Sequence, residues 1–178
     1  MVRIETDRLL LRDIDIEKDF APFCEMMADE DTVRFIGGQT MTPVQTWRAI
    51  AMLIGHQAIH GYGFYSVIEK ASGAWVGRVG HWNPYGWYAP EVGWTIHPAF
   101  TGKGFASEAG AACTRYAFET LGWDRVIHVI HSKNIASIKT AEKIGSRKID
   151  EINGVPGLID DLCFVYGQNR TGGNGAPE

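Results

Sequence analysis

The stretch Glu91–Leu121, EVGWTIHPAFTGKGFASEAGAACTRYAFETL, decides the fold that we expect for this chain. Its first six residues alternate as a strand does, and Pro98 ends that strand because proline cannot donate to a ladder. Gly102-Lys103-Gly104 follows and leads into a helical pattern. The apolar face of that pattern recurs at steps of three and four, at Ala109, Ala112, Cys113, Tyr116, Ala117 and Leu121. The sequence therefore predicts a strand, a glycine turn and a helix in direct succession.

The glycine turn has the chemistry of an anion-binding site. The first N–H groups of a helix have no partner within the helix, and the helix dipole places partial positive charge there. Glycines let the backbone approach a phosphate closely, and Lys103 adds a mobile positive charge. We therefore expect the turn to hold a phosphate or pyrophosphate, although the same glycine spacing also occurs in purely structural turns.

Length and composition indicate one globular domain. The chain has 178 residues, of which 45% are hydrophobic and 21% charged, which is ordinary for a soluble domain. A net charge of −4 and a pI near 5.9 argue against a nucleic-acid partner. No apolar run approaches the roughly 20 residues of a membrane span. We expect a cytoplasmic protein with no membrane partner, with three free thiols at Cys24, Cys113 and Cys163, and with no metal site.

The rest of the chain predicts further strands and helices around the opening stretch. A strand at 8–12 precedes helices at 15–28 and 43–61, and strands at 62–69, 74–82 and 87–97 form a meander. A strand at 125–130, a helix capped by Asn134 and ended by Gly145, and a hairpin of 147–153 and 158–167 complete the order. We expect an α/β fold with a single mixed, mostly antiparallel central sheet and about four helices, in one domain at 1–167 with a disordered tail at 168–178.

Two strand-to-helix junctions, Thr101–Ser107 and Ser132–Ser137, are the segments most suited to a ligand. If their strands are neighbours in the sheet, the two helix starts lie side by side. A crevice at the ends of strands is a favoured ligand position.

Taken together, the element order and three segments resemble the GNAT superfamily of acyl-CoA-dependent N-acetyltransferases. The segments are IETDRLLLR at 4–12, GWTIHPAFTGKGFASEA at 93–109 and NIASIKTAEKIG at 134–145. Within the superfamily the chain is most similar to the Rim-type branch of ribosomal-protein N-terminal acetyltransferases, and the resemblance extends from Ile4 to Tyr166. It implies acetyl-CoA as co-substrate and a primary amine as acceptor, with a protein N-terminal amine as a candidate.

Other acceptors and roles remain open. A small amine, an amino acid or an antibiotic is an alternative acceptor, and a non-catalytic acyl-CoA-binding module is an alternative of a different class. The oligomeric state is also open, with a homodimer as one candidate.

The resemblance implies which residues bind the coenzyme. The pyrophosphate loop of the family falls on 101–106, with Thr101 where Gln or Arg is usual, and backbone N–H groups of 102–107 would hold the diphosphate. The strand at 94–96 would pair with the pantetheine amides and supply an N–H near the thioester carbonyl. Asn134 matches an Asn that contacts the pantetheine arm, and its alternative role is a helix cap. The implied residues are Trp94, Thr95, Ile96, Gly102, Lys103, Gly104, Phe105, Ala106, Ser107 and Asn134.

The catalytic assignments also depend on the resemblance. Many relatives have a Tyr acid seven residues after the matching Asn, but this position is Ala141 here. Similarity to the Rim-type branch points instead to Ser137, whose hydroxyl could hydrogen-bond the leaving thiolate. Glu91 is our candidate for the base, directly or through a water. The rival candidates for the base are His81, His97, His128 and His131. A set of aromatic residues could line the acceptor pocket, and the alternative is that they build the core: Trp47, Trp82, Trp87 and Tyr88.

Overall fold

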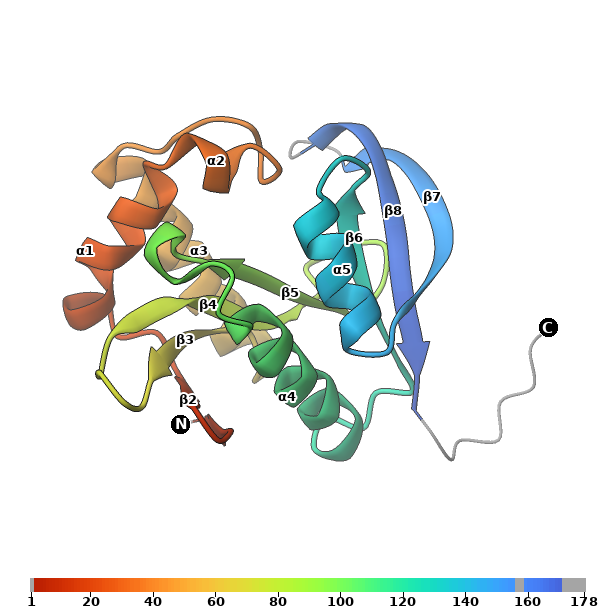
Figure 1. Cartoon of the computed structure of the whole chain (residues 1–178), viewed down its shortest axis with the longest axis horizontal. Helices are drawn as coiled ribbons and strands as arrows, with labels where there is room; N and C mark the ends of the chain where they lie inside the picture. The colour runs from red at the N-terminus through yellow and green to blue at the C-terminus, as the bar shows by residue number, and fades with distance from the viewer. Residues whose placement is uncertain (1, 156–158, 171–178) are drawn as a thin grey trace.

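The computed structural model describes residues 2–155 and 159–170, which contain one eight-stranded sheet (Figure 1). The strand order is β1-β2-β3-β4-β5-β6-β8-β7, and the pairing is antiparallel everywhere except between β5 and β6. The strands are β1 (Arg3–Glu5), β2 (Leu9–Arg12), β3 (Phe64–Glu69), β4 (Trp75–Trp82), β5 (Glu91–Ile96), β6 (Arg125–His131), β7 (Arg147–Val155) and β8 (Ile159–Asn169).

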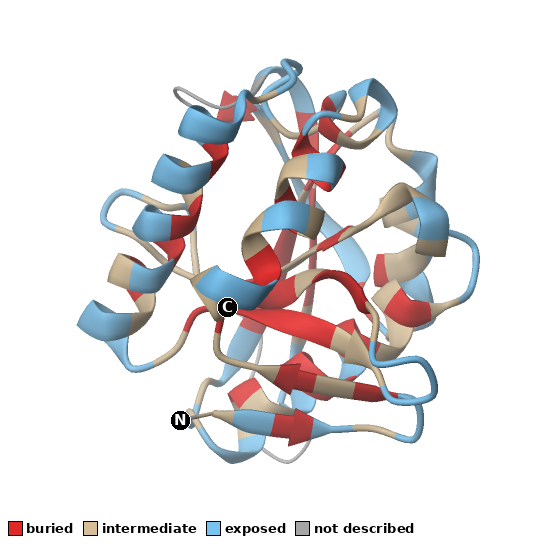
Figure 2. Ribbon diagram, turned by 90° about the vertical axis from the view of Figure 1, so that its left-hand side faces the viewer, coloured by how far each residue is buried: buried red, intermediate tan, exposed pale blue. Residues whose placement is uncertain are grey.

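Helices cover both faces of the sheet (Figure 1). They are α1 (Ile16–Met27), α2 (Glu30–Val33), α3 (Pro43–His60), α4 (Phe105–Glu119) and α5 (Ile135–Lys143), with a 3-10 turn at Pro98–Phe100. One core joins the apolar face of α4 to strands β1 to β6, and a second joins α1 and α3 to β3 and β4. Buried residues accordingly concentrate in the central strands and on the helix faces that are turned toward them (Figure 2).

The parallel neighbours β5 and β6 separate almost as soon as they meet. Their pairing in the described chain is limited to Glu91 opposite Ile127, whereas β6 stays paired with β8 from Arg125 to His131. On its other side β5 is paired with β4 along its whole length. From Gly93 onward, therefore, one edge of β5 faces an opening within the sheet.

Local sequence explains where the helices begin. The side chains of Asp15, Thr42 and Asn134 accept hydrogen bonds from first-turn N–H groups of α1, α3 and α5, and Thr42 forms a capping box with Gln45. Helix α4 differs, because its N-cap is Gly104 and no side chain caps it.

The structure confirms the expected fold and corrects several boundaries. The third strand of the meander begins at Glu91, not at Trp87, and the described chain has five α-helices where we expected about four. Strand β1 and helix α2 were not anticipated. Strand β8 reaches Asn169, inside the segment that we expected to be a tail, and residues 171–178 of that segment lie outside the described residues.

Two smaller findings concern cysteines and membranes. Cys24, Cys113 and Cys163 are free thiols, as expected. Among the described helices, none combines the length and the hydropathy that crossing a bilayer would require.

Candidate active site

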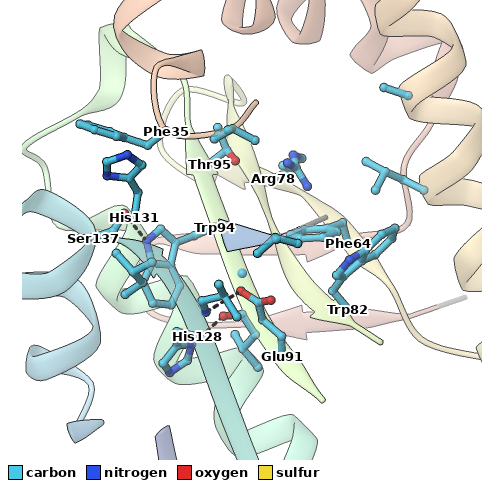
Figure 3. A pocket seen from close by; sticks show the side chains of 18 of the residues that line it. Phe35, Phe64, Arg78, Trp82, Glu91, Trp94, Thr95, His128, His131 and Ser137 are labelled. Atoms are coloured by element: carbon cyan, nitrogen blue, oxygen red, sulfur yellow. Dashed lines mark hydrogen bonds between the residues drawn. The ribbon is translucent and has the colours of Figure 1, made fainter. Parts of the chain in front are cut away.

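A cavity of about 360 Å³ lies at the opening between β5 and β6. Strands β4, β5 and β6 form its floor, α1 and α3 contribute one wall, and the start of α5 contributes another (Figure 3). Most of the lining is apolar or aromatic. The residues from our expected site that line it are Glu91, Trp94, Thr95, Asn134 and Ser137.

Glu91 is a buried carboxylate at the point where the two strands still touch. Its Oε2 accepts a hydrogen bond from Trp87 Nε1 at 2.7 Å, and its Oε1 accepts one from the Val129 amide at 3.1 Å. Burial raises the pKa of Glu91 to about 7, and these two hydrogen bonds limit the rise. A carboxyl group that titrates near neutral pH inside a cavity can take up and release protons under physiological conditions.

Ser137 lies across the opening from Glu91, in the first turn of α5. Its Oγ accepts a hydrogen bond from Trp94 Nε1 at 3.3 Å, so the indole of β5 fixes the hydroxyl of α5 (Figure 3). Because the oxygen is the acceptor in this contact, the O–H remains available to donate to a ligand in the cavity.

Asn134 begins the same helix and has two separate hydrogen-bonding groups. Its Oδ1 accepts from the Ser137 amide at 3.1 Å, so the helix-cap role that we considered is present. The cap uses only the carbonyl end of the side chain. The Nδ2 group can therefore donate to a second partner in the cavity.

The glycine turn before α4 has the geometry of an anion site. Gly102 and Gly104 have φ of 76° and 80°, a backbone conformation that favours glycine. The first helical hydrogen bond runs from the Glu108 amide to the Gly104 carbonyl at 3.1 Å, so the N–H groups of residues 105–107 come before the ladder. With no side-chain cap present, they are available to an anionic ligand.

Arg8 supports this turn from strand β2. Its guanidinium pairs with Glu108 at 2.6 Å and donates to the Lys103 carbonyl at 3.0 Å. Lys103 places its Nζ 4.7 Å from the centre of the Phe100 ring. None of residues 102–107 lines the cavity, so a ligand that uses both regions must extend from α4 along β5 to the opening.

The four histidines considered as bases are all engaged. His128 Nδ1 donates to the Val92 carbonyl at 2.6 Å and its Nε2 contacts Ser146 Oγ at 2.9 Å, while burial lowers its pKa to about 4. His81 is in the core, where its Nε2 contacts the Cys113 carbonyl and burial lowers its pKa to about 4. His131 lines the cavity, but its Nε2 lies 3.1 Å from Asp161, and His97 lies outside the cavity near Glu25. This arrangement favours Glu91 as the base.

The aromatic candidates divide into two pairs. Trp82 and Trp87 line the cavity, whereas Trp47 and Tyr88 do not and are exposed.

Sequence reasoning missed Arg78, a cation on β4 that also lines the cavity. The available signal was a charged residue inside the otherwise apolar strand AWVGRVGHW.

Comparison with known proteins places this geometry in a family. Residues 8–147 match the Acetyltransferase (GNAT) domain. The uncharacterized N-acetyltransferases YoaA and YnaD of Bacillus subtilis are 31% and 27% identical to the chain, over 82% and 83% of it and 82% and 84% of their own lengths.

Solved structures agree with this match. A GNAT-family acetyltransferase from Bacillus anthracis superposes with a TM-score of 0.81 at 25% identity, over 94% of this chain and 98% of that one. A ribosomal-protein-S5-alanine acetyltransferase from Vibrio fischeri shares the fold at 15% identity, with a TM-score of 0.77 over 97% and 98% of the two chains. The chain therefore belongs to the GNAT family of N-acetyltransferases.

Proposed function

We propose that this protein transfers the acetyl group of acetyl-CoA to a primary amine by direct attack in a ternary complex. The observation that carries the proposal is the alignment of three features: uncapped amides at α4, an unpaired edge of β5 and a cavity at the end of that edge. A long ligand with an anionic end and a reactive end matches this series. A protein N-terminal amine and a small amine are both acceptors that the cavity chemistry allows.

The chain would hold the coenzyme at three places. The N–H groups of residues 102–107 bind the diphosphate, and Lys103 adds charge. The free edge of β5 at Trp94–Ile96 pairs with the pantetheine amides, and Asn134 Nδ2 donates to the same arm. When bound, acetyl-CoA supplies an activated thioester whose carbonyl receives a backbone N–H from β5.

Two side chains would handle the protons. Glu91 accepts the proton that the amine loses as its nitrogen bonds to the acetyl carbon, directly or through a water. Ser137 donates its hydroxyl hydrogen bond to the sulfur as the carbon–sulfur bond breaks. The opening between β5 and β6 allows the amine to approach from the α1 and α3 side while the coenzyme lies on the α4 and α5 side.

Thiol release tests the proposal. Purified protein with acetyl-CoA should release free thiol when amines are added, across a panel of small amines, amino acids and peptides with free N-termini. Calorimetric binding of coenzyme A is measured in parallel. Binding without thiol release from any amine would indicate an acyl-CoA-binding module, and failure to bind coenzyme A would reject the proposal altogether.

A further inference from the structure

Arg78 is a cation in an apolar cavity, and its Nε is buried without a hydrogen-bond partner among the described residues. It extends from the middle of β4, directly opposite Thr95 of β5. Burying an ionised group without a directly hydrogen-bonded counter-charge costs free energy unless a ligand compensates for it. The mechanism proposed above gives this guanidinium no role.

Phe64 holds the guanidinium in place. Phe64, Gly80 and Gly93 are opposite one another on β3, β4 and β5, and the Phe64 ring lies over Gly93. A β carbon at Gly93 would lie 3.0 Å from Phe64 Cζ, so a side chain there would displace the ring. The Arg78 guanidinium stacks on this ring at 4.2 Å from its centre (Figure 3). Stacking occupies the flat face of the guanidinium and leaves its edge N–H groups for another partner.

The charges in the cavity favour an anion with a single charge. Burial lowers the pKa of Arg78 to about 10, with the Glu91 carboxylate partly offsetting the effect, so the guanidinium stays charged at neutral pH. Glu91 is on the same face of the sheet, opposite Trp82 and four residues along β5 from Thr95. At ~3.3 Å per residue, Arg78 and Glu91 are therefore anchored about 13 Å apart along the strands, and both side chains line the cavity between these points. A carboxylate would satisfy Arg78, whereas a dianion would be repelled by Glu91 about twice as strongly as a carboxylate is.

From these contacts we infer that the acceptor is an amino acid with an apolar or aromatic side chain and a free carboxylate, which Arg78 binds while the amine is directed toward Glu91. The inference rests on the proposed acetyl transfer and names its substrate class. The remaining walls suit such a side chain, because they include Phe35, Met41, Met52, Leu53, Trp82 and Trp87. Guanidinium and carboxylate form a charge-assisted, two-pronged hydrogen bond that matches in geometry.

A matched acceptor series tests the role of the carboxylate. Thiol release from acetyl-CoA is measured with phenylalanine, phenylalanine amide and phenethylamine, using the full chain and its Arg78→Gln variant. We expect the wild type to favour phenylalanine in kcat/KM by about ten- to a hundredfold, the range of a charge-assisted hydrogen bond. In Arg78→Gln the preference should disappear. Arg34→Gln, which removes an exposed cation outside the cavity lining, should retain it.

A binding measurement separates this inference from the proposed function. N-acetylphenylalanine and its amide contain no titrating amine, and Trp82 and Trp87 in the cavity wall report their binding through fluorescence. The acid should bind to the wild type about ten- to a hundredfold more tightly than the amide does. Acid and amide should bind to Arg78→Gln with equal affinity. This result would support the role of Arg78 even if no amine released thiol. The absence of thiol release would reject only the proposed acetyl transfer.

Three outcomes would overturn the inference. The first is equal binding of acid and amide to the wild type, and the second is an unchanged preference in Arg78→Gln. The third is detectable turnover of peptides and simple amines with none of phenylalanine. Melting temperature and coenzyme A affinity report whether Arg78→Gln is folded. If it is not, Arg78→Lys keeps the charge but loses the planar fork and should reduce the preference for the acid severalfold.

Discussion

Helices α4 and α5 both begin just after a strand beside the opening in the sheet, but they use their first turns differently. Helix α4 begins at a positive-φ glycine with no side-chain cap, so its amides remain available. Helix α5 begins at Asn134, whose side chain accepts from the Ser137 amide. The first junction presents backbone N–H groups and the second presents side chains.

This difference assigns a separate task to each junction. Backbone amides cannot be removed by changing a side chain and bind a diphosphate well, but they cannot transfer a proton. A capped helix start offers fewer free amides to an anion, but it holds a hydroxyl in a fixed position. We expect changes at α4 to affect coenzyme binding and changes at α5 to affect turnover.

The largest effect should come from Ser137→Ala at the second junction. Removing the hydrogen-bond donor to the leaving sulfur should lower kcat by up to about 10³-fold, within the usual range for loss of one donor to a developing negative charge. Coenzyme A affinity, measured by calorimetry, should stay within a factor of two. Thr140→Ala is the matched control, because that hydroxyl lies one turn further along α5 and donates to the Ala136 carbonyl. A normal kcat in Ser137→Ala would remove the acid assignment.

Glu91→Gln should have the next largest effect, since Glu91 lies in the cavity where strands β5 and β6 meet. Its Cα partner is Ile127 on β6, and its pKa is about 7 because of burial. The wild-type rate should be low in acid and rise to a plateau as pH passes through 7, because the base must be ionised. Glu91→Gln should lower kcat/KM about 10²-fold at pH 8 and abolish this step in the pH–rate profile.

Ionisation of Glu91 should lower the stability of the fold as the pH rises, whereas it raises the rate. The folded-state pKa is raised from 4.5, so the folded state holds the proton more tightly than the unfolded state does. The wild type should therefore lose stability as pH rises from about 4.5 to about 7, and Glu91→Gln should lose less over that interval. A pH–rate profile that Glu91→Gln leaves unchanged would assign the base elsewhere.

Ser107→Asp at the first junction should have a smaller effect on coenzyme binding. A carboxylate in the first turn of α4 interacts favourably with the helix dipole, so unfolding should cost about 0.3–1 kcal/mol more. The same charge repels a diphosphate, so the Kd for coenzyme A should rise about tenfold or more. Acetyl-pantetheine, which has no diphosphate, should be used equally well by variant and wild type. Ser107→Ala keeps the amide and should change neither quantity.

Most of this difference between the starts of α4 and α5 could be predicted from the sequence, because helix caps and glycine turns are local features. Asp15, Thr42, Asn134 and Gly145 are at helix ends as expected. Strand β1 and helix α2 escaped prediction because segments of three and four residues are too short to show periodicity.

The cavity was less accessible to sequence reasoning, because its walls come from segments that are far apart in the chain. We expected a strand from Trp87 onward, but Trp87 precedes β5 and instead donates to Glu91. Arg78 has no motif of its own, and its role depends on Phe64, fourteen residues earlier in the numbering, and on the opening beside β5. Only the assembled sheet brings these groups together.

The smallest effect should come from separating the two groups of Asn134. Asn134→Ala removes the cap of α5 and should cost about 1 kcal/mol of stability, which lowers the melting temperature by about 3 °C. Asn134→Asp keeps a capping oxygen but loses the Nδ2 donor, so it should retain the melting temperature and raise the KM for acetyl-CoA severalfold. If Asn134→Asp matches the wild type in both measurements, Asn134 is only a cap, and the contact of α5 with the coenzyme falls to Ser137 alone.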